Sequence, residues 1–364
     1  MIVTFDPPEN VGGVEGRLAG YVRELTRQGH FVEVETFSPS HATNTMEFHG
    51  VKLHERRSGV SDLPQSFRFT LTRMKDSHID SVFFLSGGIT LFGSLLLLYC
   101  RLTHRRTAML LYGKDVLQAM RRPLTRVLLF VSTSLTNSVL ANSRFTSTLV
   151  PFVDSRKIHI LYPGVDQSMA TLGATNSHIP GKKILFVGRI VRRKGLEDLI
   201  DAFRALVEEV PDATLEIVGD GPQKSELERM VADFDLGARV SFLGTLRGKA
   251  LYERYSLCDV FAMPSVTLKN DVEGFGTVFL EAGLFGKPSV GTTSGGIPEA
   301  VENGKTGLLV SEGNVFELAR ALRRLVTDVD FASFLGQNAR ERVVREFTWA
   351  ESTMQLVKSL ARSS

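Results

Sequence analysis

Two glutamates eight residues apart, Glu273 and Glu281, flank a Gly-Phe-Gly turn in this sequence. The apolar residues after the turn predict a helix that begins at about Val278, so that Glu273 precedes its first turn and Glu281 lies about one turn inside. A helix N-terminus attracts phosphate, and carboxylates accept hydrogen bonds from sugar hydroxyls. The combination suits a nucleotide sugar, although a capped helix with solvated acids would show the same spacing.

Three further segments rich in glycine and proline follow this turn, at residues 286–291, 294–301 and 303–310. The whole block from Glu273 to Val310 resembles the donor-site signature of the family 4 retaining glycosyltransferases. That family has the GT-B fold and includes phosphatidylinositol mannosyltransferases and related glycolipid and lipopolysaccharide glycosyltransferases. The resemblance implies an α/β protein with two Rossmann-like, doubly wound domains that face a central cleft.

The resemblance also implies roles for residues of the turn. Glu273 would contact the donor sugar, and Glu281 would accept hydrogen bonds from the ribose hydroxyls. Backbone or hydroxyl groups of Phe275, Gly276 and Thr277 would contact the sugar and the phosphate. These assignments are predictions, carried over position by position from the matching motif.

The predicted strand 183–188 ends in Gly188-Arg189, and a basic turn at residues 191–195 follows it and contains Lys194. Cations just beyond a strand end can neutralise a departing diphosphate. By resemblance, Arg189 and Lys194 grip the pyrophosphate and join Glu273 as the catalytic residues, with Gly188 among the donor-binding residues. A solvated basic loop is the alternative interpretation of the same sequence.

Four other residues are weaker candidates. Gly12 and Gly13 follow the first predicted strand and would let the backbone approach the donor phosphate, although a tight turn explains them equally well. Arg247 follows the predicted strand near residue 244, where the nucleotide base binds in relatives. Tyr112 lies where many relatives carry a His in a His-Gly-x-Asp setting, and we expect it on the acceptor side; with a reference pKa near 10, it is a poor base at neutral pH.

The elements that must position these residues alternate between strand and helix in both halves of the chain. In the first half, a strand at 1–5, a helix at 17–28 and a strand at 30–37 form a β-α-β unit, which implies a parallel sheet with ligands at the carboxyl ends of its strands. The apolar segment 89–100 is too short to cross a bilayer and is interpreted as a buried helix. Further strands are expected at 81–85, 108–111, 138–141, 159–161, 183–188, 213–219, 240–244 and 260–264.

The chain of 364 residues is long enough for two domains of ordinary size. We expect an acceptor-side domain at residues 1–170, a linker at 171–182 and a nucleotide-sugar-binding domain at 183–345. Residues 346–364 would form a C-terminal helix that crosses back to the first domain. Only two cysteines occur, which indicates no disulfide framework and a reducing compartment, and no signal peptide is visible.

Positive charge is concentrated in the first half: residues 1–165 hold 19 Lys and Arg against 13 Asp and Glu, whereas residues 166–364 hold 24 against 27. The basic residues between Arg101 and Arg126 are interleaved with apolar ones. They could meet an anionic membrane or an acidic acceptor, or form a solvated helix face. Nucleic acid is not an expected partner, because no recognition motif occurs.

The sequence therefore predicts a retaining hexosyltransferase that moves a hexose from a GDP- or UDP-linked sugar to a glycan or lipid-linked hydroxyl acceptor. We expect no bound cofactor and no metal, since no Asp-x-Asp motif occurs where a metal would be needed. The location would be cytoplasmic, at the inner face of the membrane. Two alternatives stay open: a sugar-nucleotide-binding protein with little or no turnover, and a sugar-nucleotide epimerase or phosphorylase of the same fold.

Overall fold

The computed structural model describes residues 1–5, 13–38, 45–57, 63–76, 78–172 and 182–361. It divides the chain into two compact units. Unit 1 comprises Met1–Gly164 together with Trp349–Ser364, and unit 2 comprises Val165–Thr348. The chain thus leaves the first unit before the linker expected at 171–182, of which residues 173–181 lie outside the described part.

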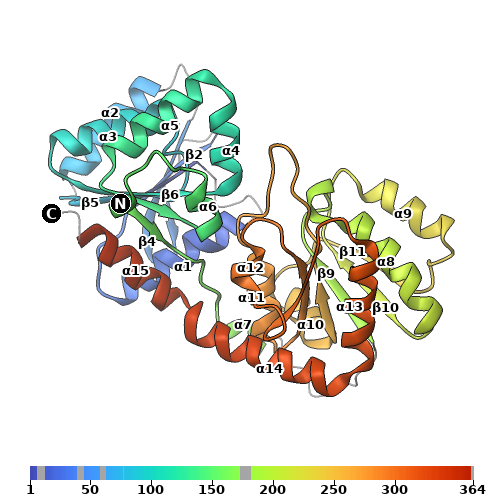
Figure 1. Cartoon of the computed structure of the whole chain (residues 1–364). Coiled ribbons are helices and arrows are strands. Elements are labelled where there is room, and N and C mark those ends of the chain that lie inside the picture. The colour runs from blue at the N-terminus through green and yellow to red at the C-terminus, as the bar shows by residue number, and fades with distance from the viewer. Residues whose placement is uncertain (6–12, 39–44, 58–62, 77, 173–181, 362–364) are drawn as a thin grey trace. The chain divides into compact units, whose positions relative to one another are not determined.

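Unit 1 is built on one sheet of eight strands in the order β3-β4-β2-β1-β5-β6-β7-β8 (Figure 1). All neighbours pair in parallel except β3 and β4, which form an antiparallel hairpin at one edge. The sequence interpretation did not include this hairpin. The strands are β1 Ile2–Thr4, β2 Val34–Ser38, β3 Thr45–Phe48, β4 Val51–Arg57, β5 Ser81–Phe84, β6 Arg106–Leu111, β7 Ser138–Ala141 and β8 Ile158–Ile160.

Alternating side chains of these strands fill two apolar layers, one on each face of the sheet. Val3, Val82 and Phe84 belong to one layer, and Ile2 and Phe83 belong to the other. Both faces are covered by helices, which explains why the strands are apolar at consecutive positions instead of alternating. The helices are α1 Gly13–Arg27, α2 Leu63–Asp76, α3 Leu91–Leu102, α4 Gly113–Arg121, α5 Pro123–Leu135, α6 Arg144–Thr148 and α15 Trp349–Ala361, with a 3₁₀ turn at Ser155–Lys157.

Helix α15, at the end of the chain, completes the layer that α1 begins (Figure 1). The ring of Trp349 packs edge-on against Tyr21 with centroids 5.2 Å apart, and the Tyr21 hydroxyl shares a hydrogen bond of 2.9 Å with Ser352. A side chain at Gly20 would collide with the Trp349 ring, since its Cβ would lie 2.2 Å from that ring. Residues from Trp349 onward are therefore part of the first unit.

The expectation of a buried helix at 89–100 is wrong in one respect. Helix α3 forms there, with Thr90 accepting a hydrogen bond from the Gly93 amide at its N-terminus, and Phe92 and Leu97 lie in the core. Its opposite face, however, carries exposed leucines from Leu91 to Leu102. An unbroken apolar run cannot reveal which side of a helix is covered, because it has no polar face to mark the solvent.

Unit 2 contains a wholly parallel sheet in the order β11-β10-β9-β12-β13-β14. In chain order this is 3-2-1-4-5-6, the Rossmann arrangement, in which the direction of winding reverses between the first and fourth strands. Those strands are β9 and β12. The six strands are β9 Lys183–Val187, β10 Thr214–Val218, β11 Val240–Gly244, β12 Val260–Ala262, β13 Ser289–Thr292 and β14 Gly307–Val310.

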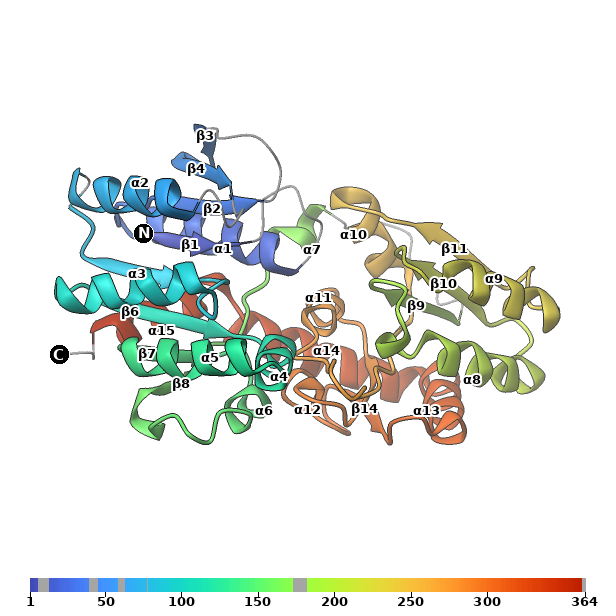
Figure 2. The same ribbon diagram turned by 90° about the horizontal axis from the view of Figure 1, so that it is seen from above.

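Helices cover the unit 2 sheet as expected for a doubly wound fold. Helix α13 packs along α8, as Figures 1 and 2 both show, and α11 packs along α14. Leu199 and Phe203 of α8 and Leu322 of α13 are fully buried. The helices are α7 Ser168–Leu172, α8 Leu196–Glu209, α9 Lys224–Asp233, α10 Gly248–Leu257, α11 Thr277–Leu284, α12 Ile297–Ala300, α13 Val315–Thr327 and α14 Val329–Glu346, with a 3₁₀ turn at Arg192–Lys194.

Candidate functional site

The loops that leave β9 and β12 carry a cluster of charged residues in unit 2. Strands β9 and β12 pair in parallel, so their carboxyl ends lie at the same edge of the sheet. Because the winding reverses between them, this edge is where open α/β sheets hold a ligand. The loop after β9 contains Arg193 and Lys194, and the loop after β12 leads to Glu273.

Glu273 lies between two cations. One of its carboxylate oxygens accepts a hydrogen bond from the Lys194 ammonium at 2.5 Å and another from the Arg193 guanidinium at 2.6 Å. Arg193 also pairs with Asp271 at 3.0 Å. The Glu273 residue is 9% exposed, so these charges are largely shielded from water. The cluster therefore gathers two cations and two carboxylates at the switch point of the sheet.

The three charges at the centre of this cluster control one another. Burial alone would raise the pKa of Glu273, but the positive charges of Lys194 and Arg193 outweigh it and bring the pKa to about 2. Burial lowers the pKa of Lys194, and Glu273 opposes that effect. Burial also opposes the charged form of Arg193, whose pKa is nevertheless raised by Glu273 and Asp271. Glu273 is consequently a carboxylate at every physiological pH and cannot act as a general acid in this state.

The β9 loop holds its cations in place by close backbone packing. Gly195 has φ of +65°, and a Cβ there would lie 1.9 Å from the carbonyl oxygen of Pro264, in the loop after β12. Only glycine fits this contact without moving one of the loops. The aliphatic part of Lys194 also packs beside Gly188, and its ammonium lies 3.2 Å from the Met263 sulfur. The backbone thus brings Lys194 under the loop that carries Glu273.

A second pair of glycines supports the backbone of Glu273. The amide of Gly296 donates a hydrogen bond of 3.0 Å to the Glu273 carbonyl. A Cβ at Gly295 would lie 2.2 Å from that same carbonyl oxygen, and a Cβ at Gly296 would lie 2.2 Å from the Gly274 carbonyl oxygen. The Ser-Gly-Gly segment identified in the sequence is therefore a packing surface for the Glu273 turn.

Helix α11 begins at Thr277, one residue before the expected start. Gly276 is its N-cap, with φ of +85°, and offers no side chain to satisfy the first amides of the helix. These amides and the positive end of the helix dipole are suited to an anionic ligand. Phe275 is buried against Phe347, so its expected contact with a donor can come only from its backbone.

Glu281 lies one turn into α11, as expected. It accepts a hydrogen bond of 2.7 Å from the hydroxyl of Tyr255, which is fully buried in α10. Burial raises the pKa of Glu281, while the hydrogen bond from Tyr255 and the charge of Lys194 oppose the increase. The action of Lys194 on both Glu273 and Glu281 shows that these two acids share one electrostatic environment.

Two residues expected at the donor site are not part of this cluster. Arg189, the second residue after β9, is exposed, and Arg247 is the exposed N-cap of α10 after β11. Neither makes a side-chain hydrogen bond or ion pair with a described residue. Arg193, which the sequence interpretation did not single out, occupies the position next to Glu273 instead. The basic run 192–194 was visible, but only the turn geometry determines which of its members points to Glu273.

The acceptor-side candidates belong to unit 1. Gly12 lies outside the described residues, and Gly13 is the first residue of α1. Tyr112 is the N-cap of α4, at the carboxyl end of β6. The guanidinium of Arg17 lies over the Tyr112 ring, 4.9 Å from its centroid, although Arg17 is only 7% exposed. Arg17 is therefore a further candidate that sequence reasoning missed, since nothing in its local sequence indicates burial.

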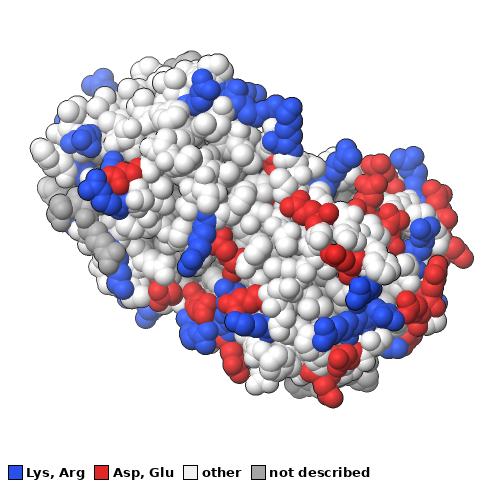
Figure 3. Space-filling model, in the orientation of Figure 1, with Lys and Arg blue, Asp and Glu red and all other residues white. Residues whose placement is uncertain are grey.

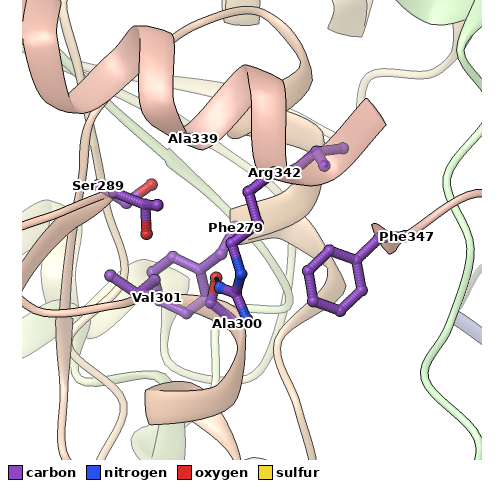
Figure 4. A pocket seen from close by; sticks show the side chains of 9 residues that line it. Phe279, Ser289, Ala300, Val301, Ala339, Arg342 and Phe347 are labelled. Atoms are coloured by element: carbon purple, nitrogen blue, oxygen red, sulfur yellow. Dashed lines mark hydrogen bonds between the residues drawn. The ribbon is translucent and has the colours of Figure 1, made fainter. Parts of the chain in front are cut away.

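The small pocket drawn in Figure 4 is separate from the Glu273 cluster and has a structural explanation. Its apolar wall includes Phe279 and Phe347. The Arg342 guanidinium donates hydrogen bonds to the carbonyls of Glu299 at 2.8 Å and Ala300 at 3.1 Å. Arg342 thus ties α14 to α12, and the pocket is the space left around this tie.

Comparisons with known proteins show which class of protein this chain resembles in sequence and fold. Residues 175–342 match the family model described as glycosyl transferases group 1. This match covers a little less than half of the chain, and the two Rossmann-like units have the architecture of the GT-B glycosyltransferase structures that they resemble. The family resemblance and the fold class inferred from the sequence are both confirmed.

Several individual relatives are named as sugar transferases. It is 35% identical over 217 residues to the GDP-mannose-dependent α-(1-6)-phosphatidylinositol monomannoside mannosyltransferase of Mycobacterium tuberculosis, a match that covers 57% of this chain and only 56% of that enzyme. The enzyme of the same name from Mycolicibacterium smegmatis is 29% identical over 99% of this chain and 98% of its own length. Among solved structures, Anabaena HepE in complex with UDP and glucose has a TM-score of 0.79 at 21% identity, with 99% of each chain covered.

Proposed function

We propose that this chain is a retaining hexosyltransferase that uses a nucleoside diphosphate sugar and requires no metal. The observation that carries the proposal is the Glu273 cluster: two cations, Arg193 and Lys194, lie beside a carboxylate at the Rossmann switch point. The open N-terminus of α11 follows four residues after Glu273. Cations and helix amides suit the diphosphate, and a carboxylate suits the sugar hydroxyls.

Each group would have a distinct task in the reaction. The bond between the sugar C1 and the diphosphate oxygen breaks, and its electron pair stays with the diphosphate. Lys194, Arg189 and Arg193 would stabilise the charge that develops on this leaving group. The acceptor oxygen forms the new bond to C1 on the same face of the sugar, and the acceptor proton passes to the departing diphosphate. Glu273, already ionised, would hold the sugar hydroxyls and the positive charge of the reacting centre.

The remaining donor contacts follow from the same placement. Glu281 would accept hydrogen bonds from the ribose, held for that purpose by Tyr255 at 2.7 Å. The amides at Gly276 and Thr277 would bind the distal phosphate. Gly188 and Arg247 would adjoin the diphosphate and the base, and Gly12 and Gly13 would approach the donor from unit 1. The mycobacterial relatives are named as GDP-mannose-dependent and HepE was solved with UDP-glucose, so both donors are candidates.

The acceptor would be a hydroxyl on a glycan or a lipid-linked molecule at the cytoplasmic face of a membrane, with peripheral contact to anionic lipid. Tyr112 and Arg17 lie at the carboxyl edge of the unit 1 sheet, where an acceptor would bind. Tyr112 would hydrogen-bond the acceptor without acting as its base, because the leaving group takes the proton. No bound cofactor takes part.

The direct test supplies GDP-mannose or UDP-glucose with a set of glycan and lipid-linked acceptors and determines the anomeric configuration of the product. A ligand at about 100 times its dissociation constant adds about 2.7 kcal/mol of stability, so a thermal-shift screen of nucleoside diphosphates selects the base first. A product of inverted configuration would refute retention. Absence of any nucleotide-dependent shift would refute the donor site.

The second candidate is a sugar-nucleotide-binding protein with little or no turnover. Tyr112, in place of the histidine of many relatives, favours it. The two candidates differ in slow hydrolysis of the donor in water, which a transferase performs at a low rate without acceptor. Tight nucleotide binding with no hydrolysis and no transfer would favour the binding protein.

A further inference from the structure

Helix α3 carries an apolar stripe on the side that faces away from the sheet. Leu91, Leu95, Leu98 and Leu102 are between 41% and 71% exposed. Their spacing of four, three and four residues places them on one face of the helix. The other side of α3 is fully buried at Phe92, Leu96, Leu97 and Cys100. The helix is therefore apolar all round, although only half of it is covered.

Helix α5 repeats this arrangement beside α3. Leu124, Val127, Phe130 and Val131 are between 39% and 71% exposed, and their spacing again defines one face. Leu129 points inward to the same core layer that receives Phe92 and Leu96 of α3. Both helices thus cover the same side of the sheet.

The two stripes form one surface, because the helices pack against each other. Ser94 of α3 and Ser132 of α5 share a hydrogen bond of 2.9 Å between their buried hydroxyls. The exposed stripes consequently lie side by side above this contact. We call this surface, made of the eight exposed apolar side chains, the α3/α5 face.

Positive charge predominates in the segment that carries the α3/α5 face. Between Ser81 and Val153 the sequence contains eight Lys and Arg but only one acid, Asp115. Arg101, Arg121, Arg122 and Arg126 are exposed, and none makes a salt bridge with a described residue. In Figure 3, blue side chains with little red mark the visible surface over α4 and α5. Basic residues around a flat apolar surface are typical of a segment that lies in a lipid headgroup layer.

One basic residue in this region has a different task. The Arg105 guanidinium donates to the carbonyl of Ile79 at 2.9 Å and lies over the ring of Tyr99. It ties α3 to the segment that leads into β5. Arg105 is therefore excluded from the lipid-binding set, and its replacement would test folding.

We propose that the α3/α5 face rests in the headgroup layer of an anionic bilayer, with its exposed arginines on lipid phosphates. Helices α3 and α5 have 12 and 13 residues, and no helix of the described part is long and apolar enough to cross a membrane. A second copy of the chain is a poorer occupant, because a symmetric dimer through this face would bring like charges together. This inference identifies the surface that would make the membrane contact included in the proposed function. It does not depend on sugar transfer, since vesicle binding is measured without a sugar donor.

The charge arm of the test uses flotation of the full chain with vesicles of phosphatidylcholine alone or with about one third phosphatidylserine. Near an anionic surface each arginine contributes about fivefold in partitioning. Replacing Arg101, Arg121, Arg122 and Arg126 by Gln, which keeps helix propensity, should lower binding to anionic vesicles more than about tenfold. A matched control changes four exposed arginines of unit 2, Arg204, Arg229, Arg320 and Arg340, to Gln and should leave binding unchanged.

The apolar arm replaces Leu95, Leu98, Leu124 and Val127 by Gln. These side chains are exposed, so the fold should persist while vesicle binding falls at every salt concentration. The control replaces exposed apolar residues of unit 2 in the same number, namely Phe316, Val329, Phe334 and Val344. Nucleotide-dependent thermal shift, measured on all variants, reports the donor site separately.

Four results would overturn the proposal. The first is failure of the unaltered chain to bind anionic vesicles, and the second is binding that ignores both sets of substitutions. The third is a loss of vesicle binding in the unit 2 control variants as large as in the α3/α5 variants. The fourth is a dimer in sedimentation velocity that the Leu-to-Gln set dissociates, which would assign the face to a second copy. Loss of the nucleotide shift with vesicle binding intact would refute the proposed function alone.

Discussion

Replacing Glu273 by Gln should destabilise the free protein while making it more responsive to nucleotide. The amide has nearly the shape of the carboxylate but no charge. The substitution therefore leaves Arg193 and Lys194 in a shielded site without the carboxylate that pairs with both, although Arg193 keeps its ion pair with Asp271 at 3.0 Å. Removing one partner of a buried ion pair is costly because the remaining charge stays out of water.

Two routes give the size of this effect. Breaking a buried pair typically costs about 3–5 kcal/mol. Independently, a carboxyl whose pKa falls from 4.5 to about 2 on folding contributes about 3 kcal/mol at neutral pH. The expected loss for Glu273→Gln is thus about 3 kcal/mol in the free energy of unfolding at pH 7.

The dependence of this loss on pH follows from the direction of the pKa shift. Because the pKa of Glu273 is lowered on folding, its stabilisation is fully present above the unfolded value of 4.5 and disappears as the pH falls toward 2. The variant lacks this group at every pH. The difference between the two proteins should therefore be constant above about pH 5 and shrink below it.

Urea unfolding measures this loss in the free energy of unfolding of unit 2. The transition of that unit is identified as the one that a nucleoside diphosphate shifts. Glu209→Gln is the control: its carboxylate also pairs with an arginine, Arg323, at 2.8 Å, but both side chains are about half exposed. An exposed pair contributes less than about 1 kcal/mol. The diphosphate should also stabilise Glu273→Gln more than the unaltered protein, since it supplies the missing negative charge.

A loss for Glu273→Gln no larger than for Glu209→Gln would refute the reasoning. So would a difference that stays constant from pH 7 to pH 3, because it would show that the charge of Glu273 does not contribute. Either result would mean that the ion pairs with Arg193 and Lys194 are not maintained in solution.

Three further outcomes test other parts of the site. Tyr255→Phe removes the hydrogen bond that lowers the pKa of Glu281, so the pH below which nucleotide affinity falls in calorimetry should move upward, and the free energy of unfolding should drop by about 1.5–3 kcal/mol. Gly195→Ala should lower the free energy of unfolding by well over the roughly 1 kcal/mol expected for Gly304→Ala. Both glycines have positive φ, but only at Gly195 would a Cβ meet a carbonyl oxygen, at 1.9 Å. Equal losses of stability for the two variants in thermal unfolding would contradict this. Transfer should survive saturating EDTA, and abolition by the chelator with recovery on adding magnesium would contradict the proposed metal-free mechanism.

The sequence predicted the β-α-β order and the location of the Glu273 turn, because both depend on local patterns. Alternating apolar strands and helices define a doubly wound sheet, and the Gly-Phe-Gly turn identifies the start of a helix. The observed start at Thr277 differs from the expected Val278 by one residue because Gly276 adopts a left-handed conformation as the N-cap. Such conformations are invisible in composition alone.

Contacts between side chains far apart in the chain could not be predicted from the sequence. Arg193 and Glu273 are 80 residues apart, and no local pattern indicates which of three adjacent basic residues reaches the carboxylate. The hydrogen bond from Tyr255 to Glu281 joins two different helices in the same way. The exposed side of α3 was missed for a related reason. Whether a row of leucines is buried depends on which elements pack against it in the tertiary structure, and the sequence of the helix does not show this.

Because α15 packs on unit 1, it affects the order in which the two units can fold during synthesis. Ribosomes add about 5–20 residues per second, so the 165–348 segment occupies them for roughly 10 to 40 s after the first sheet has emerged. Throughout that interval Tyr21 and the surface at Gly20 lack the Trp349 ring that covers them. The second unit can thus reach its native state before the first, and a nascent chain halted after Thr348 would present an open hydrophobic surface to chaperones although both sheets were complete.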